Sequence, residues 1–283
     1  MRSLWTSASG MKSMQTQLDT LAQNMANLNT AGYKAQSVQF KDALTQQMNQ
    51  KTEESNLVRR DSNPGLRLGH GVLPMALMGN FTQGSLQDTG NGMDVALDGD
   101  GFFKVGLAGP GGTTPKQLFT RDGSFKVGMV DDGAGNKTPY LVDGSGRYVL
   151  DDNDQPIDLT GYDMSKLVVK EDGTLLENNN GFTNTIATLG IVQVDHPEEN
   201  LDRAGENLYA LRVNVPNTAV TARANITNGA VPNARQGFIE QSNVDMSTEM
   251  TEMLVAQRAY TMNTKALQTA DQMMGIANNL RNG

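Results

Sequence analysis

The two ends of the chain repeat with a period that the middle lacks. Near each terminus, apolar and small residues recur at alternating steps of three and four, which is the heptad spacing of a long helix that packs along one side. The first seam consists of Leu4, Ser7, Met11, Met14, Leu18, Leu21, Met25 and Leu28. The second seam consists of Met253, Ala256, Tyr260, Asn263, Leu267, Ala270, Met274 and Ala277. The sequence therefore predicts a long helix at each end.

The side chains of the two seams differ in size, which favours pairing between them. Ala256, Asn263 and Ala270 form a column of small residues that would let a helix with bulky side chains approach closely. The alternative, in which each seam packs on a separate globular core, stays open here. The face of the first helix opposite its seam is polar but uncharged, at Gln15, Thr16, Gln17, Thr20, Gln23 and Asn24. We expect neighbouring copies to cover this face, because uncharged polar groups are buried at little cost once hydrogen-bonded.

Turn-forming residues mark where the terminal helices begin and end. Residues 29–32 (NTAG) should end the first helix, with Gly32 in the left-handed conformation. Ser242 or Asp245 could cap the last helix. A second short amphipathic stretch is indicated by Val38, Phe40, Leu44 and Met48.

The middle of the chain has short apolar runs separated by turn dipeptides, a pattern typical of β-hairpins. The dipeptides are Asn91-Gly92, Asp122-Gly123, Asp143-Gly144 and Asp172-Gly173. The expected strands lie at residues 101–105, 124–127, 140–142, 166–169 and 189–194, and residues 219–234 resemble a return connector. The predicted class is α+β, with paired terminal helices and a β-rich centre. The expected segments are 1–48 (N-terminal helical part), 49–80 (extended connector), 81–232 (β-rich domain) and 233–283 (C-terminal helical part).

Composition excludes several classes of protein. The formal net charge of −8 makes nucleic acid and anionic membranes poor partners. No apolar run approaches the roughly 20 residues of a membrane-spanning helix, so no membrane insertion is expected. Residues 1–32 are interleaved with polar side chains and do not resemble a cleavable signal. The chain has no Cys, which excludes disulfides and thiolate metal sites.

Residues suited to catalysis or metal binding are sparse. The only histidines are His70, in the polar connector, and His196, in an expected turn before a proline, so no catalytic residue is assigned. Residues 98–101 (DGDG) resemble the start of a calcium loop, but Phe102 and Gly109 occupy positions that need oxygen ligands. Turn chemistry explains these residues better. We therefore expect a non-enzymatic chain without a cofactor or metal.

Residues 21–34 (LAQNMANLNTAGYK) closely resemble the signature of bacterial flagellar rod and hook proteins. The characteristic positions are Asn24, Asn27, Asn29, Thr30, Gly32 and Tyr33. Further stretches resemble the same family in the same order: residues 83–86, 98–103, 119–125, 205–209, 241–244, 257–260 and 269–273. Length and residues 3–10 (SLWTSASG) are most similar to the distal rod members.

The resemblance implies a structural subunit that polymerises into a hollow drive shaft. It implies an inner tube domain built from both terminal helices, a β-rich outer domain, and export by the flagellar type III apparatus without signal cleavage. The implied partners are copies of the chain itself and neighbouring rod and hook subunits, in the basal body outside the cytoplasmic membrane. Other axial paralogues, proximal-rod or hook-related, fit the same residues. A secreted β-domain protein that acts on the cell wall and a non-flagellar adhesin are the rivals from other classes.

Overall fold

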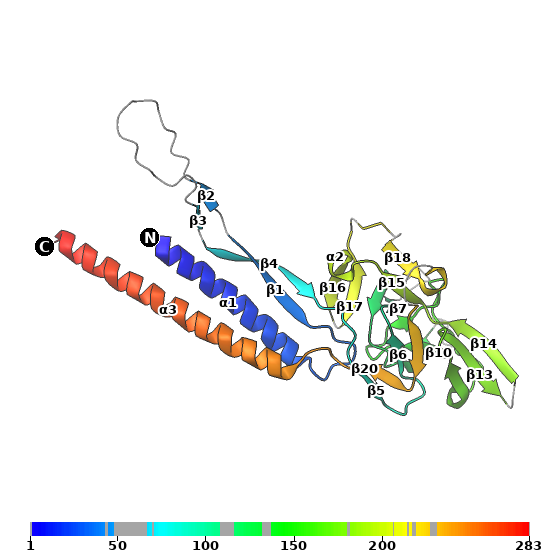
Figure 1. Ribbon diagram of the computed structural model, residues 1–283. Helices are drawn as coiled ribbons and strands as arrows, with labels where there is room; N and C mark the ends of the chain where they lie inside the picture. The colour runs from blue at the N-terminus through cyan, green and yellow to red at the C-terminus, as the bar shows by residue number, and fades with distance from the viewer. Residues whose placement is uncertain are drawn as a thin grey trace, which may run out of the picture. The chain divides into compact units, whose positions relative to one another are not determined.

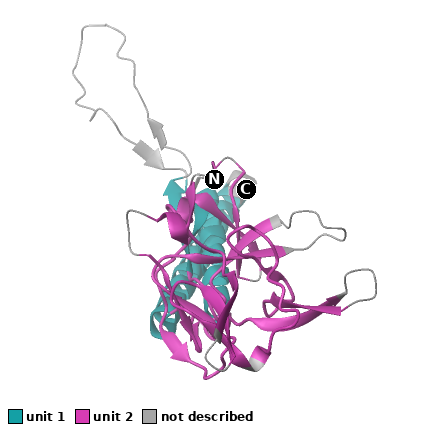
Figure 2. Cartoon of the chain, turned by 90° about the vertical axis from the view of Figure 1, so that its right-hand side faces the viewer, with its two compact units in different colours: residues 1–25, 36–78, 245–283 teal, residues 26–35, 79–244 magenta. Residues whose placement is uncertain are grey.

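The computed structural model describes residues 2–42, 45–47, 67–69, 71–107, 116–131, 137–179, 182–205, 207–213, 215–216, 219–226 and 231–282. The predicted α+β class is confirmed: a helix near each end brackets a β-rich middle (Figure 1). Contacts divide the chain into two compact units (Figure 2). Unit 1 comprises Met1–Met25, Gln36–Met78 and Asp245–Gly283. Unit 2 comprises Ala26–Ala35 and Gly79–Val244.

Unit 1 is built from two helices and paired strands. The helices are α1 (Arg2–Ala26) and α3 (Met246–Asn282). The strand pairs are β1 (Gln36–Asp42) with β4 (Val72–Gly79), and β2 (Thr45–Gln47) with β3 (Arg67–Gly69). Asp245 caps α3: its Oδ1 accepts a hydrogen bond from Ser247 N at 3.1 Å and its Oδ2 accepts one from Thr248 Oγ1 at 2.6 Å. Of the two candidate caps, Asp245 is therefore the one used.

The segment after α1 differs from the expectation. Val38 and Phe40 lie on strand β1, and part of the expected connector forms β4, where Leu73, Met75 and Leu77 alternate along the strand. An alternation of period two suits a strand, and the two strands supply each other's backbone hydrogen bonds. Leu44, Met48 and residues 49–66 lie outside the described residues, as do His70 and Gly109.

Unit 2 contains one large sheet and three smaller ones. The large sheet has the order β16-β17-β8-β7-β11-β10-β9, and β15 joins it by pairing with β7 and β18. The smaller sheets are β12-β13-β14, β19-β6 and β20-β5. The strands as far as β11 are β5 (Leu86–Asp88), β6 (Val95–Asp98), β7 (Phe102–Leu107), β8 (Lys116–Thr120), β9 (Lys126–Asp131), β10 (Lys137–Val142) and β11 (Tyr148–Val149). The later strands are β12 (Leu167–Val169), β13 (Thr174–Asn179), β14 (Phe182–Thr188), β15 (Ile191–Val194), β16 (Leu201–Gly205), β17 (Leu208–Leu211), β18 (Val220–Ala222), β19 (Asn233–Gln236) and β20 (Phe238–Glu240). Short helices are η1 (Met164–Lys166), α2 (Pro197–Asn200) and η3 (Arg223–Asn225).

Two of the four turn dipeptides form hairpins. Asp143-Gly144 joins the antiparallel pair β10 and β11, and Asp172-Gly173 joins β12 and β13. Asn91-Gly92 and Asp122-Gly123 instead connect strands that pair elsewhere, because β5 pairs with β20, β6 with β19 and β8 with β7 and β17. The expected connector at 219–234 also contributes strand β18 and the start of β19, since both find partners in unit 2.

Aromatic side chains organise the core of unit 2. Phe103 and Phe125 meet edge to face with ring centroids 5.0 Å apart in the main apolar cluster. Phe102 and Tyr209 do the same at 5.8 Å in a second cluster, against which Phe81 packs. Residues 26–35 and 233–244, which the sequence analysis grouped with the helical segments, cluster with this unit.

Candidate functional site

The polar side of α1 is partly covered by the chain's own strand β4. Ser13, which is fully buried, donates its hydroxyl hydrogen bond to Val72 O at 3.0 Å. Ser9 Oγ accepts a hydrogen bond from Val72 N at 3.3 Å. A Cβ at Gly71, whose φ is +125°, would collide with the Ser9 hydroxyl, so the close approach requires glycine. Of the uncharged side chains listed in the sequence analysis, Thr20 and Asn24 are buried within the chain itself, and cover of the others by neighbouring copies stays a prediction.

Asn24 of the signature fixes the start of β1 within unit 1. Its Oδ1 accepts a hydrogen bond from Gln36 N at 3.0 Å, and its Nδ2 donates to Gln36 O at 2.8 Å. The same amide lies 3.2 Å from both carboxylate oxygens of Glu249 on α3. Burial raises the pKa of Glu249, against the lowering effect of the Asn24 hydrogen bond. One fully buried side chain thus links α1, β1 and α3.

Two further contacts join α1 to α3. A Cβ at Gly10 would lie 3.0 Å from Asn263 Nδ2, so the helices approach closely at a residue without a side chain. Thr264 Oγ1 lies 3.4 Å from Met11 Sδ, within hydrogen-bonding distance for sulfur. Asn24 lies against Glu249, whereas Gly10 and Met11, earlier on α1, lie against Asn263 and Thr264, later on α3, so the two helices are antiparallel.

The seam positions differ in burial. Leu21, Ala256 and Ala270 are buried, whereas Tyr260 and Met274 count as exposed, at 37% and 38%. Ala277 is also exposed, and the other seam positions are partly buried: Leu4, Ser7, Met11, Met14, Leu18, Met25, Leu28, Met253, Asn263 and Leu267. Leu28 belongs to unit 2, and the remaining seam positions named here belong to unit 1.

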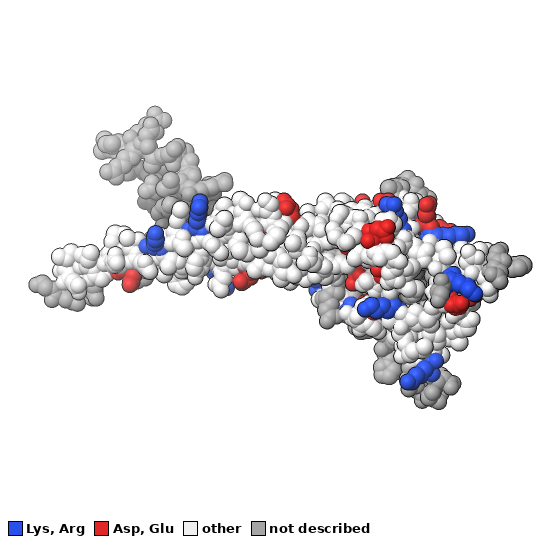
Figure 3. Space-filling view, turned by 90° about the horizontal axis from the view of Figure 1, so that it is seen from below, with Lys and Arg blue, Asp and Glu red and all other residues white. Residues whose placement is uncertain are grey.

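α3 exposes a second apolar face. The 3.6-residue period places Leu254 and Ile276 of this face nearly opposite Ala256 and its other members to one side. Its large side chains are each more than half exposed: Leu254, Val255, Met262, Met273, Ile276 and Leu280. Trp5 of α1 is also exposed, at 75%. Charged side chains are sparse on the helices, so most of their visible surface is white in Figure 3.

The second half of the signature belongs to unit 2. Thr30 Oγ1 donates to Asn27 Oδ1 at 3.2 Å, which shapes the turn after α1, and Asn29 is exposed. Gly32 has φ +66°, and a Cβ there would lie 2.6 Å from the backbone of Arg121. Tyr33 is fully buried, and the guanidinium of Arg203 stacks 4.7 Å from its ring centroid. Gly32 and Tyr33 therefore form part of the β-rich unit's interior.

Glu240 is the centre of a buried ionic cluster that the sequence did not reveal. Its Oε1 accepts hydrogen bonds from Lys34 Nζ at 2.6 Å and from Gly84 N at 2.8 Å. Its Oε2 accepts one from Arg121 at 3.0 Å. Burial, followed by the nearby Arg121 charge, lowers the pKa of Lys34, and the carboxylate opposes both effects. Only the position of Lys34, as the last residue of the signature stretch, could have drawn attention to the cluster.

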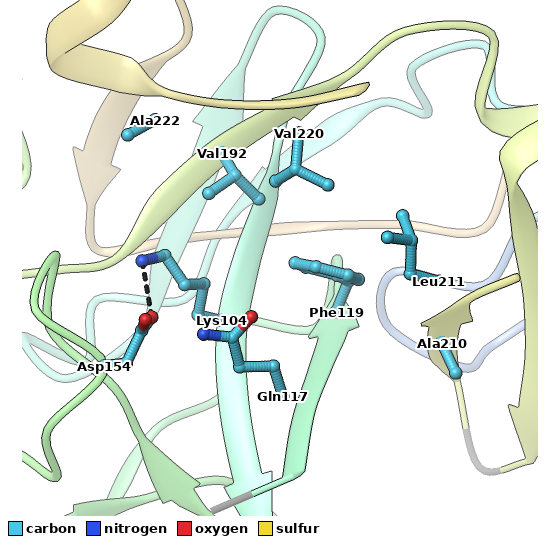
Figure 4. A pocket seen from close by; sticks show the side chains of 9 residues that line it. All are labelled: Lys104, Gln117, Phe119, Asp154, Val192, Ala210, Leu211, Val220 and Ala222. Carbon is cyan, nitrogen blue, oxygen red and sulfur yellow. Dashed lines mark hydrogen bonds and ion pairs between the residues drawn. The ribbon is translucent and has the colours of Figure 1, made fainter. Parts of the chain in front are cut away.

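A pocket in unit 2 has little catalytic character. It has a volume of about 320 Å³ and is walled by apolar side chains from β8, β15, β17 and β18 (Figure 4). Asp154 is the only carboxylate among its lining residues, and Lys104 Nζ binds it at 2.8 Å. Hydrolysis of glycosides would need two free carboxyl groups across a cleft, and this pocket does not present them.

The other candidate sites among the described residues also lack the side-chain groupings that ligand binding needs. Over the ranges that the structure describes, no three His, Asp or Glu side chains are grouped so that they could hold a metal ion. His196 is exposed and has a left-handed backbone at φ 45°. Neither helix, within its described residues, has a stretch apolar enough to cross a membrane.

Comparison with known proteins identifies the class. Residues 4–34 match the family described as "Flagella basal body rod protein", and residues 235–280 match "Flagellar basal body rod FlgEFG protein C-terminal". The chain is 32% identical to the flagellar hook-basal body complex protein FlhP of Bacillus subtilis, over 99% of this chain and 100% of the relative. It is 35% identical to the flagellar basal-body rod protein FlgG of Borreliella burgdorferi and 31% identical to FlgG of B. subtilis, over 99% of each chain.

An axial structural protein of the bacterial flagellum is thus the class that the signature and these matches define. The chain belongs to the flagellar basal-body rod protein family, as the resemblance of residues 21–34 implied. It is a structural subunit of the rod in the flagellar basal body, and this family is not known as an enzyme family. The rival interpretation as a cell-wall-acting protein is not favoured.

Proposed function

We propose that the chain polymerises with copies of itself into a hollow helical shaft that transmits torque towards the hook. In this proposal the seams of α1 and α3 pair as a coiled-coil-like tube domain, and the β-rich unit clads the tube. Three α1–α3 contacts support the pairing: Asn24 with Glu249, Gly10 with Asn263, and Met11 with Thr264.

The observation that carries self-assembly is the exposed apolar face of α3. Leu254, Met262 and Ile276 are all on the side of the helix away from its contacts with α1. Burying one such side chain contributes about 1.5 to 3 kcal/mol, so leaving the whole face in water is costly. A second copy of the chain would cover this face.

The contact must be heterologous to build a shaft. A patch that binds a different patch on the next copy generates a helix when the rotation does not close. The seam of α1 and the outer face of α3 are different surfaces, which satisfies this condition. Other rod and hook subunits, with similar terminal helices, would continue the same contacts at the ends of the rod. In the same proposal the flagellar type III export apparatus delivers the chain, as the resemblance of residues 21–34 implied.

The experiment compares two substitutions of exposed apolar residues by aspartate. Leu254→Asp lies on the outer face of α3, and Val213→Asp lies in unit 2, where Val213 is 99% exposed. Both monomers should stay folded, because neither side chain is buried. We expect Leu254→Asp to abolish rod assembly and motility, and Val213→Asp to preserve both. Normal basal bodies in the Leu254→Asp strain, by electron cryo-tomography, would overturn the proposal.

A further inference from the structure

At three places where the chain passes between the units, the adjoining segments of unit 2 meet around one side chain. The first segment ends at Ala35, the second begins at Gly79 and includes Asn80, and the last ends at Val244 and includes Asn243. We infer that Asn243 is a positioning residue that ties these three segments together inside unit 2. Polymerisation is not part of this inference, which concerns the single chain.

The Asn243 amide uses both its acceptor and its donors. Its Oδ1 accepts a hydrogen bond from Ala35 N at 2.8 Å. Its Nδ2 donates to Asn80 O at 2.8 Å and to Thr82 O at 3.0 Å. Asn80 N in turn donates to Ala35 O at 2.7 Å. Each of the three segments is therefore bonded to the other two.

The buried ionic cluster holds the same segments a second time. Lys34 Nζ donates to Thr82 O at 2.7 Å and to Glu240 Oε1 at 2.6 Å. Gly84 N donates to the same Glu240 oxygen at 2.8 Å. The Asn243 amide and the Lys34–Glu240 pair thus both join the end of the first segment, the start of the second and the end of the last.

Only a primary amide of this length can both accept a hydrogen bond from Ala35 N and donate to the carbonyls of Asn80 and Thr82. Asp would keep the acceptor for Ala35 N but would turn a carboxylate oxygen towards the carbonyls of Asn80 and Thr82. Leu has similar bulk and supplies neither donor nor acceptor. Because the three segments are tied, a force that reaches unit 2 along one of them is shared with the other two.

The test measures amide hydrogen exchange in the full-length protein for Asn243→Asp and Asn243→Leu. The amides of Ala35 and Asn80 report on the tie, and those of Leu150 and Ile157 report on the core of unit 2. Asn225→Asp, at an exposed asparagine of η3, is the matched control. Loss of a hydrogen bond worth about 1.4 kcal/mol accelerates exchange about tenfold.

We expect the Ala35 amide to exchange at least about tenfold faster in Asn243→Leu, which removes its acceptor, and less so in Asn243→Asp, which keeps it. The Asn80 amide should exchange faster in both variants, because both lose the donors to Asn80 O and Thr82 O, while the core amides stay within about twofold of wild type. The control should change neither set. An equal acceleration of all four amides would show a general loss of stability and would overturn the positioning role. Unchanged exchange at Ala35 in Asn243→Leu would overturn it as well. Should the Leu variant not fold, Asn243→Ala gives the same readout without added apolar bulk.

Discussion

Lys34 and Glu240, separated by 206 positions in the sequence, form a 2.6 Å ion pair with side-chain exposures of 1% and 0%. Arg121 completes the cluster from a third segment at 3.0 Å. A carboxylate that serves two buried cations is costly to remove, because both cations would remain without their counter-charge.

Glu240→Gln keeps the side-chain volume and removes the charge. We expect it to lower the free energy of unfolding of unit 2 by about 3 to 5 kcal/mol. Asp202→Asn is the control, since the Asp202–Arg212 pair is about half exposed and such pairs contribute at most about 1 kcal/mol. Urea unfolding, followed by the amide signals of unit 2, measures both. Equal midpoints for the two variants would contradict the role given to Glu240.

Asn24 and Asn29 allow a test within one signature. Asn24→Ala leaves the N–H and C=O groups of Gln36 without their partner, at a cost of about 1 to 3 kcal/mol to unit 1. Asn29 is exposed, so Asn29→Ala should change stability by less than about 0.5 kcal/mol. Thermal unfolding monitored by helical circular dichroism, with exchange of the Gln36 amide, separates the two. A larger loss of stability in Asn29→Ala than in Asn24→Ala would refute these different roles for the two signature residues.

Ala256 is 1% exposed, whereas Ala266 on the same helix is exposed. Ala256→Phe should strain the packing of α3 in unit 1 and cost about 1 to 3 kcal/mol. Ala266→Phe supplies the same bulk on the exposed side and should leave the helical melting curve of the monomer unchanged. Identical melting curves for the two variants would show that Ala256 does not face a packed surface.

Burial raises the pKa of Tyr209 to about 12, from 10.0 in the unfolded chain. The folded state therefore keeps this proton when the unfolded state has lost it. The resulting stability is fully present below pH 10 and disappears as the pH rises through 12, with a total of roughly 2 to 3 kcal/mol. Tyr209→Phe should flatten the dependence of unfolding free energy on pH over this window. Parallel pH profiles for Tyr209→Phe and wild type would contradict the assignment.

The helices could be predicted because their signal is local. Residues of one seam lie three or four positions apart, and Asp245 caps α3 within the same turn. The strands at β7, β10 and β12 carried local signals of the same kind, in short apolar runs beside turn residues. The alternation of Leu73, Met75 and Leu77 was also present, but the surrounding polar residues and Pro74 obscured it.

The polar interior could not be predicted, because its partners are distant. Ser13 and Asn24 look like solvated helix residues until β4 and β1 are placed against them. Nothing near Glu240 indicates that Lys34 will approach it. The strands on either side of Asn91-Gly92, β5 and β6, pair with β20 and β19, which lie after residue 230. Contacts of this kind become visible only when the tertiary structure is known.

Both units are assembled from pieces that are separated along the chain. Asn24 and its partner Glu249, for example, are 225 positions apart in the sequence. During synthesis or passage in the N-to-C direction, the last part of unit 2, up to Val244, is available before any residue of α3. The β-rich unit can therefore finish folding first, and α1 acquires its helical partner only after unit 2 is complete. Completion of unit 1 would then set the order of folding, since it can occur only after the residues of α3 have emerged.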